Sequence, residues 1–105
     1  MTDRLAILIA SAGAERPELC ATPLVHALAA HALDAEVEIH FAGPAVRLLV
    51  AGLADGLYAT PSREKSIGEF LGEVIACDIP LYACGMARAG WVGADEALIP
   101  QARAA

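Results

Sequence analysis

The chain has 105 residues, enough for one hydrophobic core but too few for two, so we expect a single domain over residues 1–105. Hydrophobic residues make up 57% of the sequence and charged residues only 19%. A monomer of this size cannot easily bury so much apolar surface, and we therefore expect a homo-oligomer. The formal net charge is −6 and the seven Lys and Arg residues are scattered singly, which argues against nucleic acid as a partner.

The three cysteines, Cys20, Cys77 and Cys84, form no CxxC motif, and no histidine stands at a Cys–His zinc spacing. We expect neither a disulfide framework nor a metal site, and the cytoplasm is the simplest compartment. The apolar run Arg4–Ala10, followed by small residues, resembles the start of a secretory leader but is too short for one. No segment approaches the roughly 20 apolar residues of a membrane span, so we expect no membrane partner.

Residues Arg4–Ala10 form a continuous apolar run, which predicts a strand buried on both faces in the middle of a parallel sheet. The loop that follows, residues 11–18, places the hydroxyl of Ser11 at the carboxyl end of this strand. Gly13 allows a tight backbone there. We interpret the loop as a candidate wall of a binding site, with an ordinary polar connection as the alternative.

The first helix runs to about Leu33 and begins either near Pro17 or with Thr22 as N-cap. The start matters because a helix that begins at Thr22 leaves Cys20 in the loop. Residues 36–41 alternate strictly between polar and apolar side chains, which predicts a strand at or near the sheet edge with one wet or interfacial side.

Two further helices are expected before the last cysteine. Gly43-Pro44 begins the second, whose apolar stripe is Val46, Leu49, Val50 and Leu53. Residues 52–62 are expected to be a long connection. The third helix has Ser66 as N-cap, Glu69 closing a capping box, a structural Cys77 at its end, and an apolar stripe of Ile67, Phe70, Leu71, Val74 and Ile75.

The segment that organises the chain is residues 78–91, in which Cys84 follows the apolar strand Ile79–Ala83 and precedes a short helix. Unpaired N–H groups at a helix N-terminus favour the thiolate form of a cysteine. Arg88, four residues on, would add a second positive charge, and Gly85 would let a partner molecule approach the sulfur closely. The alternative is a buried cysteine that acts as a small hydrophobe.

Strands alternating with helices predict an α/β fold. We expect a small, doubly wound, mostly parallel sheet of four to five strands with helices on both faces. The last residues either add a marginal edge strand or stay loose. Ligand chemistry in such sheets gathers at the carboxyl ends of the strands, where Ser11, Cys84 and, if it lies in the loop, Cys20 would be found.

Residues 81–91, Leu-Tyr-Ala-Cys-Gly-Met-Ala-Arg-Ala-Gly-Trp, resemble the single-cysteine segment of DsrE/DsrF-like sulfur-relay proteins. The opening strand, the alanine-rich helix, the strand running into Phe41-Ala42-Gly43-Pro44 and the helix before the cysteine strand follow in that family's order. The resemblance implies a flavodoxin-like fold and assembly into dimers, trimers or hexamers. It also implies that Cys84 carries sulfane sulfur as a persulfide. Because this chain ends early, we expect a short last strand.

We therefore expect a sulfur carrier or sulfurtransferase that passes sulfur from Cys84 to an acceptor thiol on a protein or small molecule. Ser11, Gly13, Gly85 and Arg88 are the candidate substrate-binding residues, Cys20 is a candidate second thiol, and no cofactor is required. One alternative is an oligomeric module that binds a small molecule or anion without catalysis. FMN and NAD are disfavoured because the chain has no GxGxxG motif and few aromatic residues. The other alternative is a redox sensor in which Cys20 resolves an oxidised Cys84.

Overall fold

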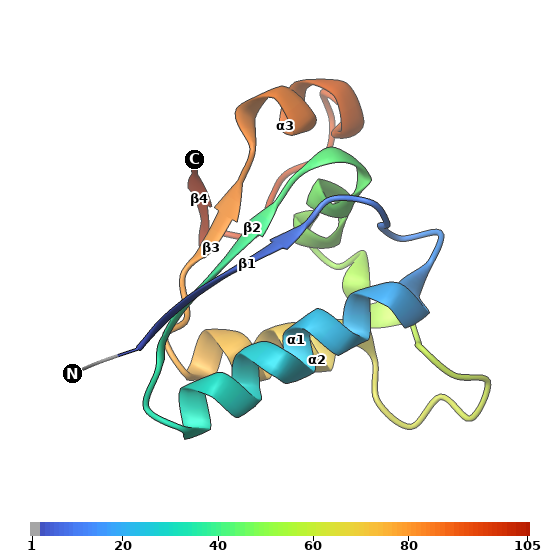
Figure 1. Ribbon diagram of the computed structural model, residues 1–105. Coiled ribbons are helices and arrows are strands. Elements are labelled where there is room, and N and C mark those ends of the chain that lie inside the picture. Colours follow the sequence, from blue (N-terminus) through green and yellow to red (C-terminus); the bar gives the residue numbers. More distant parts are fainter. Residues whose placement is uncertain (1–2) are drawn as a thin grey trace.

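The computed structural model describes residues 3–105. It contains one four-stranded sheet with helices packed against it (Figure 1). The strands are β1 (Arg4–Ile9), β2 (Glu36–Phe41), β3 (Leu81–Ala83) and β4 (Ala102–Ala104). The α-helices are α1 (Pro17–Ala32), α2 (Ile67–Ala76) and α3 (Gly85–Trp91), and the 3₁₀ helices are η1 (Gly43–Leu49) and η2 (Ala54–Gly56).

All neighbouring strands in the order β1-β2-β3-β4 run parallel, which confirms the α/β fold expected from the sequence. The winding differs in one detail from the doubly wound sheet that we expected. Every crossover steps the same way across the sheet, and right-handed crossovers of that kind place their helices on one face. Figure 1 accordingly shows α1 and α2 side by side beneath the sheet, and the other face exposes strand side chains such as Leu8.

The central position expected for the first strand is wrong, whereas the second strand lies near the sheet edge, as expected. β1 lies at the sheet edge, where Leu8 is 66% exposed and Leu5 is 39% exposed, whereas β2 lies between β1 and β3. The polar side of β2 lies on the uncovered face, where the ring of His40 stacks on that of Tyr82 with centroids 4.9 Å apart. The apolar run therefore predicted the strand correctly, but it did not show that both faces of the strand are covered.

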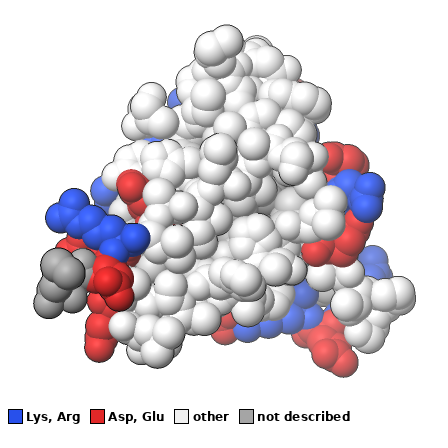
Figure 2. All heavy atoms as spheres, viewed as in Figure 1, with Lys and Arg blue, Asp and Glu red and all other residues white. Residues whose placement is uncertain are grey.

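The outer side of β1 and α1 forms a surface almost without charge. Figure 2 shows that on the face where these two elements lie in front, Lys, Arg, Asp and Glu gather at the rim. Between Leu19 and Leu33 the sequence contains no Lys, Arg, Asp or Glu. Exposed apolar side chains on these two elements are Leu5, Leu8, Leu19 and Val25. Leu5 and Leu8 are three positions apart and project from opposite faces of the edge strand β1. We use the name β1–α1 patch for these four residues.

The core lies between the sheet and the helical layer. Its largest fully buried side chains come from α1, β2, η1, α2 and β3: Leu24, Ile39, Phe41, Leu48, Leu49, Ile67 and Leu81. The expected second helix is the 3₁₀ helix η1, and Val50 after it forms an antiparallel bridge with Leu98. This extended pairing stops the helix before Leu53, so the predicted stripe is cut short.

The third helix follows the sequence closely. Ser66 is the N-cap of α2, and its hydroxyl oxygen accepts a hydrogen bond from the N–H of Glu69 at 3.0 Å. Residues 52–62 contain η2, and Tyr58 in this connection forms a bridge with Ser66. The last residues form the short strand β4, one of the two outcomes left open by the sequence. In the part of the chain that the structure describes, no helix has the length and apolar character needed to cross a membrane.

Candidate functional site

The carboxyl ends of β1, β2 and β3 meet at one edge of the sheet, and Cys84 lies there. The strand pairing continues one residue past the strands: the N–H of Ala42 donates to Ile9 O at 2.9 Å, and the N–H of Cys84 donates to Phe41 O at 3.0 Å. Cys84 therefore lies beside Ala42 and two strand spacings from Ala10, which is about 10 Å.

Cys84 is the N-cap of α3, at the junction of strand and helix predicted from the sequence. It is half-buried, and its carbonyl oxygen accepts the first hydrogen bond of the helix from the N–H of Arg88 at 2.9 Å. Its side chain forms no capping hydrogen bond to α3. Cys84 thus packs against the core without being fully buried, and its side chain is not used as a cap.

Gly85 and Arg88 accompany Cys84 on this short helix, and both are exposed. A Cβ atom added at Gly85 would meet no atom outside its own helix and chain neighbours within 4 Å, so the surface at Gly85 is open. Arg88 lies one helical turn from Cys84. The structure places both residues where the sequence predicted them, and their part in binding a substrate stays a prediction.

Ser11 and Gly13 lie in the loop after β1, at the same edge of the sheet but separated from Cys84 by the end of β2. Ser11 is exposed. Gly13 is buried, and a Cβ atom there would overlap the carbonyl oxygen of Pro44 at the start of η1. Close packing between this loop and η1 explains why position 13 is a glycine. A role of either residue in binding stays a prediction.

Cys20 lies inside α1, because the helix begins at Pro17 and continues through Pro23. Its side chain is wholly buried, and its Sγ donates to Gly13 O at 3.5 Å and to Arg16 O at 3.6 Å. Burial, together with the negative charges of Glu15 and Glu18, raises the pKa of Cys20 to about 11. The helix start at Thr22, which would have left Cys20 in the loop, is therefore wrong.

Arg47 is a residue near the site that the sequence analysis missed. It extends from η1, where its Nη1 donates to Trp91 O at 2.7 Å and both Nη atoms donate to the Glu96 carboxylate at 2.9 Å. The Arg47 hydrogen bond, with a further one from the Gly93 N–H, lowers the pKa of Glu96 to about 2. A lone charge between the buried residues Val46 and Leu48 was the signal that could have revealed it.

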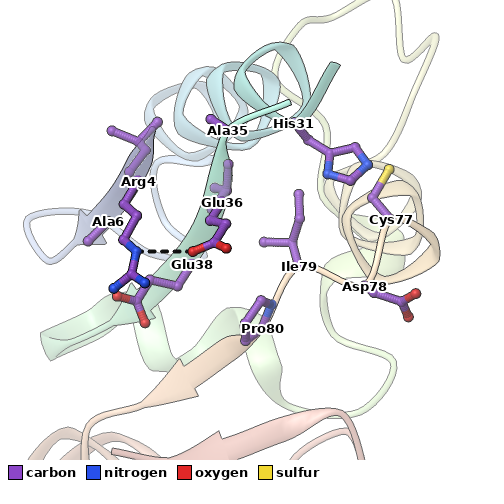
Figure 3. Close-up of a pocket in the computed structure, with 12 residues that line it drawn as sticks. Arg4, Ala6, His31, Ala35, Glu36, Glu38, Cys77, Asp78, Ile79 and Pro80 are labelled. Carbon is purple, nitrogen blue, oxygen red and sulfur yellow. Dashed lines mark ion pairs between the residues drawn. The ribbon is translucent and has the colours of Figure 1, made fainter. Parts of the chain in front are cut away.

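A cavity of about 690 Å³ lies at the opposite end of the strands, by the amino ends of β1, β2 and β3. Figure 3 shows the Arg4–Glu36 ion pair at one side of it and His31 and Cys77 at the other. It is too far from Cys84 to serve that residue. In residues 3–105, no three His, Cys, Asp or Glu side chains come close enough together to hold a metal ion.

These features define a small α/β domain with one half-buried cysteine at a strand-to-helix turn on the carboxyl edge of a parallel sheet. The chain belongs to the DsrE/DsrF-like family, whose model matches residues 4–100. The crystal structure of the ychN protein from E. coli has the same fold, with a TM-score of 0.70 and 18% sequence identity over 100% of this chain and 85% of that one. A search of curated proteins found no match.

Proposed function

We propose that this protein accepts sulfane sulfur on Cys84 as a persulfide and passes it to an acceptor thiol on a protein or a small molecule. The observation that supports the proposal most is the position of Cys84, half-buried as the N-cap of α3 with open space at Gly85, in a chain of the DsrE/DsrF-like family. Because thiols must stay reduced for such a relay, we place it in the cytoplasm.

The transfer needs no net oxidation or reduction. The Cys84 thiolate attacks the terminal sulfur of a donor persulfide, a new S–S bond forms at Cys84, and the old S–S bond breaks, releasing the donor as a thiolate. An acceptor thiolate then attacks the terminal sulfur on Cys84, and the Cys84 thiolate leaves with its electron pair. The N–H groups of the first turn of α3 lack partners within the helix and would stabilise the negative charge on each sulfur anion.

The test compares wild type with Cys84→Ala after incubation with inorganic polysulfide, using intact mass with and without reductant. We expect wild type to gain one or more sulfur atoms, which reductant removes, and Cys84→Ala to gain none. Cys20→Ala is the matched control, because it also removes one thiol and should load like wild type. Equal loading of wild type and Cys84→Ala would contradict the proposal.

The two alternatives receive less support from the geometry. A sensor that forms a Cys20–Cys84 disulfide would need to expose Cys20, which is wholly buried and has a raised pKa. A disulfide between these residues after peroxide treatment would revive this alternative. If Cys84 reacts with neither polysulfide nor peroxide, the alternative of a non-catalytic binding module is favoured.

We also propose that the protein forms a homo-oligomer through the β1–α1 patch. β1 pairs with β2 alone among the described strands, so its other edge carries free backbone groups beside exposed leucines. An uncharged surface of this kind is complementary to another apolar surface, and a second copy of this chain has such a surface. Sedimentation velocity should show that Leu8→Asp or Val25→Asp lowers the oligomeric state, whereas Met86→Asp, at an exposed apolar residue of α3, leaves it unchanged.

A further inference from the structure

The helix that begins beside Cys84, α3, packs against η1 and buries little of its own surface. α3 is seven residues long, and Ala87 is its one buried residue. At its N-terminal end, the N–H of Cys84 donates to Phe41 O at the end of β2. A helix this short is not stable in isolation, so the position of α3 depends on its contacts with the rest of the protein.

Arg47 supplies one such contact from a different element. Its guanidinium donates to the carbonyl oxygen of Trp91, the last residue of α3, and forms a two-pronged pair with Glu96. Carbonyl groups in the last turn of a helix lack partners within it, and a cation there interacts favourably with the helix dipole. Glu96 in turn accepts from the N–H of Gly93, so the pair also fixes the segment after α3.

The Arg47–Glu96 pair and the other ion pairs of Arg and Lys in the described residues differ in the elements that they connect. Arg16–Glu18 joins residues two positions apart, Lys65–Glu73 joins α2 to its own N-terminal approach, and Arg4–Glu36 joins neighbouring strands. Arg47–Glu96 instead joins η1 to the segment that follows α3, and the same guanidinium donates to Trp91 O at the end of that helix. Figure 1 shows α3 projecting above the sheet, where such a tether has most effect.

We propose that Arg47 is a positioning residue for Cys84. By holding the C-terminal end of α3, it fixes the position of the helix and of the backbone at its N-cap, Cys84. The inference rests on the proposed function of Cys84. It predicts that loss of Arg47 slows the chemistry at Cys84 without removing any group that touches the reacting sulfur.

The experiment compares wild type with Arg47→Met, which keeps an apolar stem, and Arg47→Lys, which keeps the charge but loses the two-pronged geometry. Three quantities are measured: the rate of sulfur uptake from polysulfide, the rate of Cys84 alkylation by iodoacetamide, and hydrogen exchange of the α3 amides. We expect Arg47→Met to slow uptake and alkylation about fivefold and to speed α3 exchange by a similar factor. Arg47→Lys should recover part of each effect.

Lys65→Met is the matched control, because it removes one partner of an ion pair that does not touch α3. It should leave all three quantities at wild-type values. If Arg47→Met does not fold, Glu96→Gln tests the same contact with a neutral partner and should slow both reactions about twofold.

Wild-type rates in Arg47→Met, or equal slowing in Lys65→Met, would overturn the inference. Failure of wild type to take up sulfur would instead overturn the proposed function. In that case, alkylation and hydrogen exchange would still decide whether Arg47 positions α3.

Discussion

The two cysteines near the carboxyl edge of the sheet differ in almost every property that controls reactivity. Cys84 is the N-cap of α3, half-buried, with open space at the next residue. Cys20 lies one turn inside α1, wholly buried, with its Sγ donating to the carbonyl of Gly13. The comparison teaches that nearness to the functional edge is not enough. The place of a thiol within its helix, and its burial, decide whether it can react.

The largest expected effect is the difference in labelling rate between these two thiols. With a pKa of about 11, Cys20 would be about 0.1% thiolate at pH 8, and burial slows reagent access further. We expect iodoacetamide to modify Cys84 at least about 100 times faster than Cys20 in the native protein. Timed labelling followed by peptide mass spectrometry checks this. Similar rates at the two residues would break the comparison.

Two glycines near these thiols should respond differently to the same substitution. Gly13→Ala places a methyl group against the backbone of Pro44, and we expect a loss of about 2–4 kcal/mol in the free energy of unfolding. Gly85→Ala meets no atom within 4 Å and should change stability by less than about 1 kcal/mol. Urea unfolding of both variants measures the difference, and equal losses would contradict the packing role of Gly13.

Removing the buried thiol should affect stability and leave the chemistry unchanged. Cys20→Ala leaves a small cavity where Sγ packs in the core, and we expect a loss of about 1–2 kcal/mol in the free energy of unfolding. Sulfur uptake at Cys84 should keep its wild-type rate, since Cys20 takes no part in it. If folded Cys20→Ala takes up sulfur more slowly than wild type, Cys20 takes part in the reaction, contrary to what its burial indicates.

A further effect is a pH dependence of stability that belongs to Cys20. Its pKa is raised in the folded protein from 9.0 to about 11, so the unfolded chain loses this proton first as pH rises. The stability contribution is therefore complete below pH 9 and declines as pH approaches 11. Subtracting the unfolding curves of Cys20→Ala from those of wild type isolates this contribution. A difference that stays constant with pH would show that the thiol is less shielded than its burial implies.

Local sequence signals predicted the parts of the site that depend on neighbouring residues. The apolar run before Cys84, and the residues able to form a helix after it, were enough to locate the strand-to-helix turn. The Ser66 N-cap of α2 was likewise visible, because a capping hydroxyl and the N–H that it accepts lie three residues apart. Gly13 was recognised as a tight-turn residue, but the reason for it, contact with Pro44, lies about 30 residues further along the chain.

The sequence by itself determined the α/β class, the order of elements and the position of Cys84 between strand and helix. The spacing of hydrophobic residues and helix capping depend on residues that are close in the sequence, so a single sequence is enough to recognise them. Only the tertiary structure decided that β1 lies at the edge, that Cys20 is sealed in α1 and that Arg47 holds α3. Strand order, burial and a contact between residues 47 and 96 depend on how distant segments pack, and no local pattern records that packing.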